Sequence, residues 1–409
     1  MDWTRREFIT NISALAIGAA FPGVALAQTA SGANSRDRVI LCNEDSNTLS
    51  VIDPNTNTVA TTINLTSFDE DPRPPFRLVT GGVTPTHPAM VTKPLYHGAI
   101  NIHGAAPSPD NKLLACTGRG TSNVYLVDLE TMKVIGNTPN PQAGNETNAE
   151  RITSGVLVGR EPHEPTFSRN GKELWVTVRG ENRIAVLDTA AAIKESGGVA
   201  SRAVRLYIDC LNGPAQVWFA ADGSLAFVIS QKGSQLEVIE TNFGRDGFSR
   251  PKRRGLIDIK VQDPFGFTPF QKTARDGKEL WLSHKLADSV SAWSADAEPK
   301  ALDSVSLGKV ARPNHVEFVE NSRGKVVYAS LARVDDGGPG GVASSQIAII
   351  DRSAAAGSRK VVGTFFSHGR EAHGLWTNPE NALLYIAHEQ DELPNTANAG
   401  QTVCTAFDV

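Results

Sequence analysis

The feature that most constrains the fold of this chain is an internal repeat. Each copy contains an apolar strand, a polar turn and a second strand that ends in an acidic or polar residue. Three clear copies read VILCNEDSNTLSVID from Val39, LLACTGRGTSNVYLVD from Leu113 and LWVTVRGENRIAVLD from Leu174. Four further copies begin at Leu225, Leu280, Val326 and Leu384. Self-similarity of this kind indicates a repeat architecture in which every copy forms one supersecondary unit.

Short turn sequences and a following strand complete the unit. SPDNK from Ser108, SRNGK from Ser168 and ARDGK from Ala274 precede three of the copies. Such Asn- and Asp-rich turns join antiparallel strands tightly. A β-branched strand such as KVIGNT or AVRLYI follows many copies. Each unit is therefore predicted to be a four-stranded antiparallel sheet. Seven of these blades around an axis make an all-β, seven-bladed β-propeller.

The copies resemble the repeat of the YVTN (WD40-like) β-propeller family, which reads roughly PHGVAVSPDGKRLYVTNxxSNTVSVID. The resemblance runs from Arg38 to Val409 and implies a propeller over residues 38–409. It says little about activity, because propellers serve as enzymes, binding platforms and scaffolds. In architecture alone, the chain is also similar to the propeller domains of nitrous oxide reductase, which carries copper, and of a haem-d nitrite reductase. The first copy lacks an obvious innermost strand, and the short segment 28–37 is expected to complete the last blade.

The N-terminus has the features of an export signal. An arginine pair, Arg5 and Arg6, precedes an uncharged stretch that ends in Ala25-Leu26-Ala27. This order predicts a twin-arginine signal peptide over residues 1–27, cleavage before Gln28 and a periplasmic location. The uncharged stretch is too short for a membrane span, and no second apolar run near ~18 residues follows, so the mature chain is expected to have no span.

Charge and cysteine spacing exclude some classes of function. The formal net charge of −4 gives no general reason to expect nucleic-acid or anionic-membrane binding. The cysteines lie far apart and form no CxxC or CxxCH motif, which excludes a c-type haem attached through such a motif. No GxSxG, HExxH or Rossmann glycine motif is present, so hydrolase, zincin and dinucleotide-binding interpretations lack a basis.

Four histidines stand at the start of the strands that should line the central channel, and the sequence suggests that they share one register. They are His103, His163, His315 and His373. Neutral imidazole is a common ligand of Cu, Zn, Ni and Fe, so four converging rings predict a transition-metal site, with copper foremost. The alternative for each ring is a structural hydrogen bond to a neighbouring blade.

Arginines accompany these histidines. Arg160, Arg312 and Arg370 each stand three residues before a histidine, and Arg119 and Arg179 follow repeat strands that end at the same face. A ring of guanidinium groups suits a carboxylate or phosphate and disfavours a bare cation. Pairing with nearby glutamates is the structural alternative.

A long connection also leads to this face. Residues 67–101 interrupt the pattern after the first copy and contain His87 and His97. A loop of this length is usually functional or disordered.

Two functions of different classes follow. The first is a periplasmic propeller without turnover that binds a small anionic molecule or a periplasmic protein partner at the top of its channel. The second is a metal-dependent oxidoreductase in which the four histidines hold the ion and an arginine orients an anionic substrate. A lactonase-like hydrolase ranks third.

Overall fold

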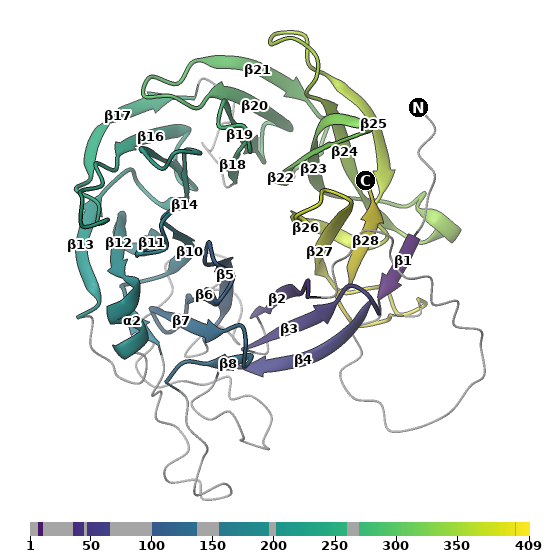
Figure 1. Ribbon diagram of the computed structural model, residues 1–409. Coiled ribbons are helices and arrows are strands. Elements are labelled where there is room, and N and C mark those ends of the chain that lie inside the picture. Colours follow the sequence, from purple (N-terminus) through teal and green to yellow (C-terminus); the bar gives the residue numbers. More distant parts are fainter. Residues whose placement is uncertain are drawn as a thin grey trace, which may run out of the picture.

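Seven small antiparallel sheets surround a central channel, which confirms the predicted seven-bladed propeller (Figure 1). The computed structural model describes residues 36–44, 47–65, 100–136, 155–195, 202–259, 270–396 and 398–409, together with the backbone of Glu7–Thr10. In blades 2 to 6 the strands run outwards from the channel in chain order, and we call these positions a to d. In blade 7 the outermost position is taken by the N-terminal segment Glu7–Thr10, and the three strands of blade 1 take positions b to d.

The strands of the first four blades are short and regular. Blade 1 contains β2 (Val39–Asn43), β3 (Thr48–Asp53) and β4 (Thr58–Asn64). Blade 2 contains β5 (Ile102–Pro107), β6 (Leu113–Gly118), β7 (Asn123–Asp128) and β8 (Lys133–Val134), and β9 (Val156–Leu157) also pairs with β7. Blade 3 contains β10 (Pro162–Phe167), β11 (Glu173–Val178), β12 (Arg183–Asp188) and β13 (Val204–Asp209), with helix α2 (Thr189–Glu195) after β12. Blade 4 contains β14 (Pro214–Phe219), β15 (Leu225–Ser230), β16 (Gln235–Glu240) and β17 (Lys252–Asp258).

The remaining blades complete the ring. Blade 5 contains β18 (Gln271–Thr273), β19 (Glu279–His284), β20 (Ser289–Ser294) and β21 (Ala301–Ser306). Blade 6 contains β22 (Pro313–Asn321), β23 (Gly324–Asp335), β24 (Ser344–Asp351) and β25 (Val361–Phe366). Blade 7 contains β26 (Arg370–Thr377), β27 (Leu383–Gln390), β28 (Cys404–Asp408) and β1 (Glu7–Thr10). No helix in the described ranges is long and apolar enough to cross a membrane.

The turns between strands a and b explain why the repeat folds as hairpins. In blade 3 the Asn170 Oδ1 atom accepts hydrogen bonds from the Ser168 hydroxyl at 2.8 Å and from the Lys172 N–H at 3.0 Å. Gly171 then takes a positive φ of 70°, which glycine adopts at low cost. The same arrangement recurs in the SPDNK turn of blade 2, where Asn111 has a φ of 56°.

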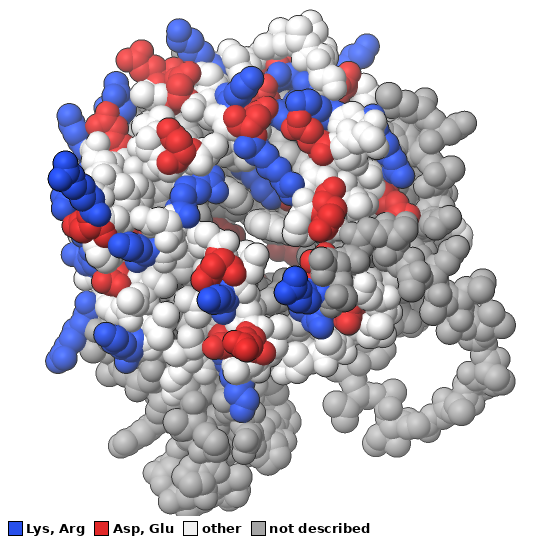
Figure 2. All heavy atoms as spheres, in the orientation of Figure 1, with Lys and Arg blue, Asp and Glu red and all other residues white. Residues whose placement is uncertain are grey.

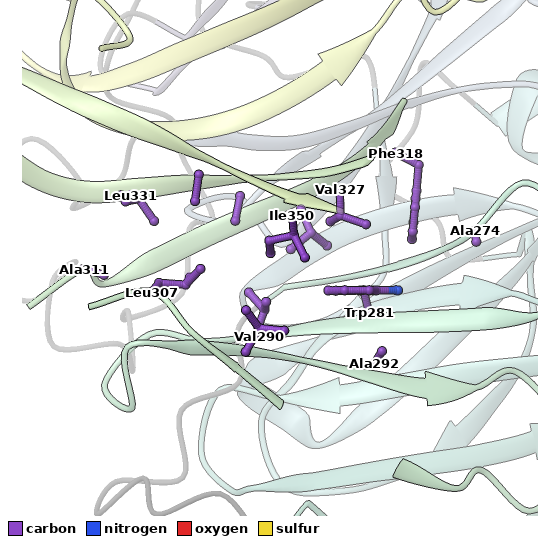
Figure 3. Close-up of a cluster of buried hydrophobic side chains, with 14 residues drawn as sticks. Ala274, Trp281, Val290, Ala292, Leu307, Ala311, Phe318, Val327, Leu331 and Ile350 are labelled. Carbon is purple, nitrogen blue, oxygen red and sulfur yellow. The ribbon is translucent and has the colours of Figure 1, made fainter. Parts of the chain in front are cut away.

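Each main hydrophobic cluster lies between two neighbouring blades, so burial of apolar faces holds the ring together. Figure 3 shows the cluster between blades 5 and 6, where Trp281, Val290 and Ala292 of blade 5 meet Val327 and Ile350 of blade 6. Both faces of these sheets are covered, which explains why the b strands read as nearly continuous apolar runs. Among the described residues the smallest cluster joins blades 7 and 1, with Leu383, Tyr385 and Ala406 packed against Val39.

Ring closure involves the N-terminal part of the chain. The β1 strand pairs antiparallel with β28, with Glu7 opposite Phe407 and Thr10 opposite Cys404. Of residues 28–37, which are expected to complete the last blade, 28–35 lie outside the described residues, so that expectation stays a prediction. Cleavage before Gln28 would remove β1 from the mature chain and leave its position in blade 7 open to another strand.

Candidate functional site

The central channel contains a cavity of about 1920 Å³. Its wall is built by the a strands, by the edge of β2 and by the turns that follow the b strands. In Figure 2 the face of the ring is hollowed at its centre, and acidic and basic side chains alternate around the opening. Below, "upper" denotes the end of the channel where the a strands begin.

The upper end of the a strand has a recurring irregular geometry. The residue directly before the strand has a positive φ in four blades, at Asn101, Glu161, Gly213 and Arg312, and in blade 7 Glu371, the second residue of β26, has a positive φ. A β-bulge follows two or three residues later in β5, β10, β14, β22 and β26. Bulges redirect side chains, and backbone strain of this kind is common at functional sites. In these five blades the bulge therefore directs consecutive side chains of strand a into the upper cavity.

A hydroxyl on the b strand fixes the bulge in three blades. In blade 3 the Thr177 hydroxyl accepts the Glu164 N–H at 3.0 Å and lies 2.9 Å from the carbonyl oxygen of Ala215 in blade 4. Thr117 makes the equivalent pair of contacts between blades 2 and 3, and Ser330 makes it between blades 6 and 7. Each of these hydroxyl bridges ties a channel residue of one blade to the backbone of the next.

The structure places three of the four candidate histidines in one register and the fourth one residue further along. His103, His163 and His373 each follow the residue that pairs at the top of strand b, whereas Asn314 takes this place in blade 6. His315 occupies the position of Glu164. The difference arises because Arg312 takes the left-handed position that Glu161 and Glu371 take in their blades. All four histidines still line the cavity.

His103 and His163 form a hydrogen-bonded pair. The His163 Nδ1 atom lies 2.8 Å from the Ala215 carbonyl oxygen and must donate, so its Nε2 atom is the acceptor. That Nε2 atom receives the Gln231 amide at 3.0 Å and lies 3.1 Å from His103 Nε2. Arg119 donates to His103 Nδ1 at 3.1 Å, so His103 carries its proton on Nε2. The network thus fixes both neutral tautomers.

His315 and His373 form a second pair, which is packed by an aromatic ring. Their ring centroids are 5.1 Å apart, and the Phe270 ring lies 4.0 Å from His315 and 4.9 Å from His373. The His373 Nε2 atom is 3.3 Å from a carboxylate oxygen of Glu389. The structure therefore groups the four histidines as two pairs. Blades 2 and 3 contribute one pair, and blades 6 and 7 contribute the other.

Burial keeps all four imidazoles neutral. Desolvation lowers the pKa of His103 and of His163 well below the usual range, and the charges of Arg119 and Arg179 lower both further. Burial also lowers the pKa of His373, to about 3, with the Lys285 charge acting in the same direction. Because cations near a ring oppose its protonation, the upper cavity holds fixed positive charge beside neutral imidazoles.

Two acidic groups lie beside the first pair, Glu44 at 3.7 Å from His103 Nδ1 and Glu164 beside His163. The Glu164 carboxylate oxygen lies 4.0 Å from His163 Nδ1. Burial raises its pKa to about 8, so at neutral pH the group is mostly protonated and can donate a hydrogen bond. Among the described residues one group of potential metal ligands is compact, namely His103, His163 and Glu164, whose ligand atoms all lie within 4.8 Å of one another.

The five candidate arginines divide into two sets. Arg119 and Arg179 are buried and line the cavity. Arg119 lies 3.0 Å from Glu44, and Arg179 lies 3.6 Å from Glu161. Burial lowers the pKa of Arg179 to about 9, so it stays charged at neutral pH.

The other three arginines are outside the cavity wall. Arg160 donates to the Gly180 carbonyl at 3.0 Å, Arg312 lies 3.6 Å from Glu371, and Arg370 donates to the Asp391 carbonyl at 2.6 Å. These three arginines therefore contact other groups of the protein, as the structural alternative expected, and do not line the channel.

A ring of residues at the upper rim was only partly found from the sequence. In five blades the residue directly after strand b lines the cavity, and in blade 7 Glu389 of β27 does so. We call this set the rim ring. Its members are Glu44, Arg119, Arg179, Gln231, Lys285 and Glu389. Two members, Arg119 and Arg179, were identified from the sequence because guanidinium groups suit anions. The others differ in residue type, so only their shared position after strand b could have revealed them.

The remaining histidines of the repeat pattern have structural roles or lie outside the described part. His284 is buried with Nε2 2.7 Å from the Ser291 hydroxyl. His388 lies 2.9 Å from both the Val403 carbonyl and the Ser367 hydroxyl. His87 and His97 of the long connection fall outside the described residues.

Two tryptophans line the lower part of the cavity. Lys272 forms an ion pair with Glu317 and lies 3.8 Å from the ring centroid of Trp376 and 5.5 Å from that of Trp218. These residues also line a second cavity of about 320 Å³ beyond them. The cavity continues past the Trp218–Lys272–Trp376 group to residues of the turns between strands a and b, such as Lys112 and Glu380.

Comparison with known proteins supports the fold and leaves the family open. No protein-family model matches the chain, and no curated protein sequence matches it. Among solved structures, the β-propeller domain of Cps50 (Swd1) from Myceliophteria thermophila aligns with a TM-score of 0.53 at 13% identity, covering 92% of this chain and 97% of that one. The dihydro-heme d1 dehydrogenase NirN in complex with DHE aligns with a TM-score of 0.53 at 12% identity, covering 90% of this chain and 60% of that one. At these identities the likeness establishes the propeller architecture alone.

Proposed function

We propose that this protein binds a small organic anion in the upper half of its channel. The observation that carries the proposal is the pair of buried, cavity-lining arginines, Arg119 and Arg179, beside four neutral imidazoles. Guanidinium groups stay charged and offer carboxylates several donors in a fixed plane. Neutral imidazoles, Gln231 and protonated Glu164 add hydrogen-bonding groups without adding negative charge.

Close to the two histidine pairs the cations of the wall favour an anion over a free cation, while the carboxylates of Glu44, Glu371 and Glu389 line the same cavity. The charges that lower the histidine pKa values, Arg119 and Arg179 on one side and Lys285 on the other, would repel an added cation in the same way. The same three charges would attract an anion. A cavity of about 1920 Å³ also exceeds what drug-sized ligands usually occupy, ~300–1000 Å³, so an organic ligand of substantial size fits.

The expected cellular compartment and one of the similar solved structures are consistent with a binding role. The predicted twin-arginine signal supports the proposal that the protein works in the periplasm. The NirN structure is of a propeller protein in complex with a ligand, DHE, although its likeness to this chain extends to the fold only. A periplasmic protein partner on the outer faces of the blades is compatible with the same channel.

Calorimetric titration with trimesate, a planar tricarboxylate, tests anion binding. We expect saturable binding to the wild-type protein that weakens as salt is added, because charged groups drive it. The charge-balanced variant Arg119→Gln/Glu44→Gln should weaken binding by about tenfold or more, since a hydrogen bond to a charged group contributes about 1.5 to 3 kcal/mol.

A matched control separates this site from surface charge. Arg254→Gln changes an exposed arginine of strand β17 and should leave trimesate binding unchanged. Equal affinity of the wild-type protein and the channel variant, or no binding of trimesate at all, would contradict the proposal.

A metal site is the second candidate, because His103, His163 and Glu164 form a compact ligand group. The hydrogen-bond network opposes it in part. His103 carries a proton on the Nε2 atom that faces His163, so ligation through that atom requires a tautomer change and loss of the Arg119 contact. The Nε2 atom of His163 would also have to release its two donors.

Elemental analysis after native export tests this candidate. A resident metal should give near-stoichiometric copper or zinc that disappears in His103→Ala/His163→Ala and persists in the matched variant His315→Ala/His373→Ala. No metal in the wild-type protein, even after reconstitution, rules the candidate out, and equal loss in both variants would place the metal elsewhere.

A further inference from the structure

Lys285 differs from the rest of the rim ring in having no hydrogen-bond or ion-pair partner for its side chain among the residues that the structure describes. Arg119 pairs with Glu44, Arg179 with Glu161 and Glu389 with His373, while Gln231 bonds His163. Between described residues, no hydrogen bond or ion pair involves the Lys285 amine. An unpaired lysine at the wall of an accessible cavity is available to a ligand.

The surroundings of Lys285 resemble those that make an amine nucleophilic. The side chain is half-buried beside the second histidine pair, and its charge lowers the pKa of both His315 and His373. Burial lowers the pKa of Lys285 itself, and Arg312 lowers it further, against Glu389 and Glu371, which raise it. Desolvation next to another cation is a general means of supplying neutral lysine for attack on a carbonyl carbon.

The cavity places this amine and the arginines on different blades around one space. Lys285 belongs to blade 5, whereas Arg119 and Arg179 belong to blades 2 and 3, and all three line the same cavity. An anion held by the arginines could therefore present a second functional group to the lysine. Only a molecule that carries both an acid and a carbonyl group would use both sides.

We propose that Lys285 forms an imine with an aldehyde or ketone that also carries an anionic group. The inference rests on the proposed anion-binding function and specifies the class of ligand. The neutral amine adds to the carbonyl carbon and gives a carbinolamine. One amine proton passes to the departing oxygen, water leaves, and a carbon–nitrogen double bond joins the ligand to Lys285. Carbonyl compound and amine thus give imine and water, with no oxidant or reductant. The neutral imidazoles of His315 and His373 offer hydrogen-bonding groups near the amine, and water can carry the protons.

Pyridoxal 5′-phosphate, which carries an aldehyde and a phosphate, is a suitable probe. The full-length protein is incubated with it at pH 7, reduced with borohydride to fix any imine, and mapped by peptide mass spectrometry. Lys285 should be modified several-fold faster than exposed lysines such as Lys194 and Lys232, because a lowered pKa raises the neutral fraction of the amine at pH 7. Excess trimesate should slow the reaction at Lys285 and leave the exposed lysines unaffected.

Two variants make the outcome decisive. Lys285→Arg keeps the charge and should abolish the fast modification, while Lys232→Arg, at an exposed position in the corresponding turn of blade 4, should leave it unchanged. Equal modification of Lys285 and the exposed lysines overturns the imine proposal. If trimesate still binds in that case, the proposed anion-binding function stands. If trimesate fails to bind the wild-type protein, the anion site itself is wrong, whatever the labelling pattern.

Discussion

Lowering the pH from 7 to 4.5 is expected to destabilise the folded protein by several kcal/mol. Burial holds the pKa of His284 at about 3, that of His373 at about 3 and that of His388 at about 4, against ~6.5 in an unfolded chain. Below pH 6.5 the unfolded chain therefore takes up protons that the folded chain refuses, and stability falls with pH. At ~1.4 kcal/mol per pH unit, each histidine contributes about 2 to 3 kcal/mol of loss by pH 4.5.

One carboxyl group acts in the opposite direction. Because the pKa of Glu164 is raised to about 8, the folded chain holds a proton there that the unfolded chain gives up above its ordinary pKa. Acidification removes this penalty, and the resulting gain in stability offsets about as much as one histidine loses. Urea unfolding at pH 7, 5.5 and 4.5 measures the sum. His284→Gln, away from the channel, should reduce the loss by about 2 to 3 kcal/mol. Equal stability at pH 7 and 4.5 would contradict the expectation.

Replacing Trp281 by alanine should destabilise the protein by about 3 to 5 kcal/mol. The indole is fully buried at the centre of the cluster between blades 5 and 6, and its Nε1 atom donates to Glu279 at 3.0 Å (Figure 3). Truncation leaves a cavity in a packed interface and deprives a buried carboxylate of a donor. Urea unfolding followed by circular dichroism measures the change, since the tryptophan signal is itself altered.

Trp376 provides the matched control on an inner strand. Its side chain is 47% exposed and contacts Lys272, so Trp376→Ala should cost about 1 kcal/mol or less. The contrast tests whether interfaces between blades, rather than the channel wall, carry the stability of the ring. A Trp281→Ala variant no less stable than Trp376→Ala would show that they do not.

The architecture was predictable because each repeat contains the sequence signals for its own strands and turns. Turn sequences such as SRNGK fix the hairpin between strands a and b locally, and apolar runs such as LWVTV mark strands covered on both faces. Seven consistent copies leave few other topologies. Closure was less accessible, because the last blade is completed by chain far away in the sequence, and nothing local in residues 28–37 specifies a partner.

The site was predictable in part, for a physical reason visible at two positions. The spacing of Arg312 and His315 is the same as that of Arg160 and His163, yet the two histidines occupy different positions. The register of each histidine depends on which residue adopts the left-handed conformation near the start of strand a. In blade 6 that residue is Arg312, so Asn314, not His315, takes the common position. Lys285 was missed because no motif surrounds it. Its proposed role follows from its position directly after strand b and from the lack of a hydrogen-bond or ion-pair partner within the described part of the chain.

The hydroxyl bridges of Thr117, Thr177 and Ser330 have a consequence for how this channel can change over time. Each hydroxyl holds a channel residue of its own blade and a backbone carbonyl of the next, so the position of a wall side chain is set by two adjacent repeats. A blade at such a junction cannot be exchanged for another copy without disturbing the ligand-facing residues beside it. Blades 2, 3 and 4, and likewise 6 and 7, should therefore be inherited together, whereas blade 5, at which none of these three bridges ends, is freer to diverge.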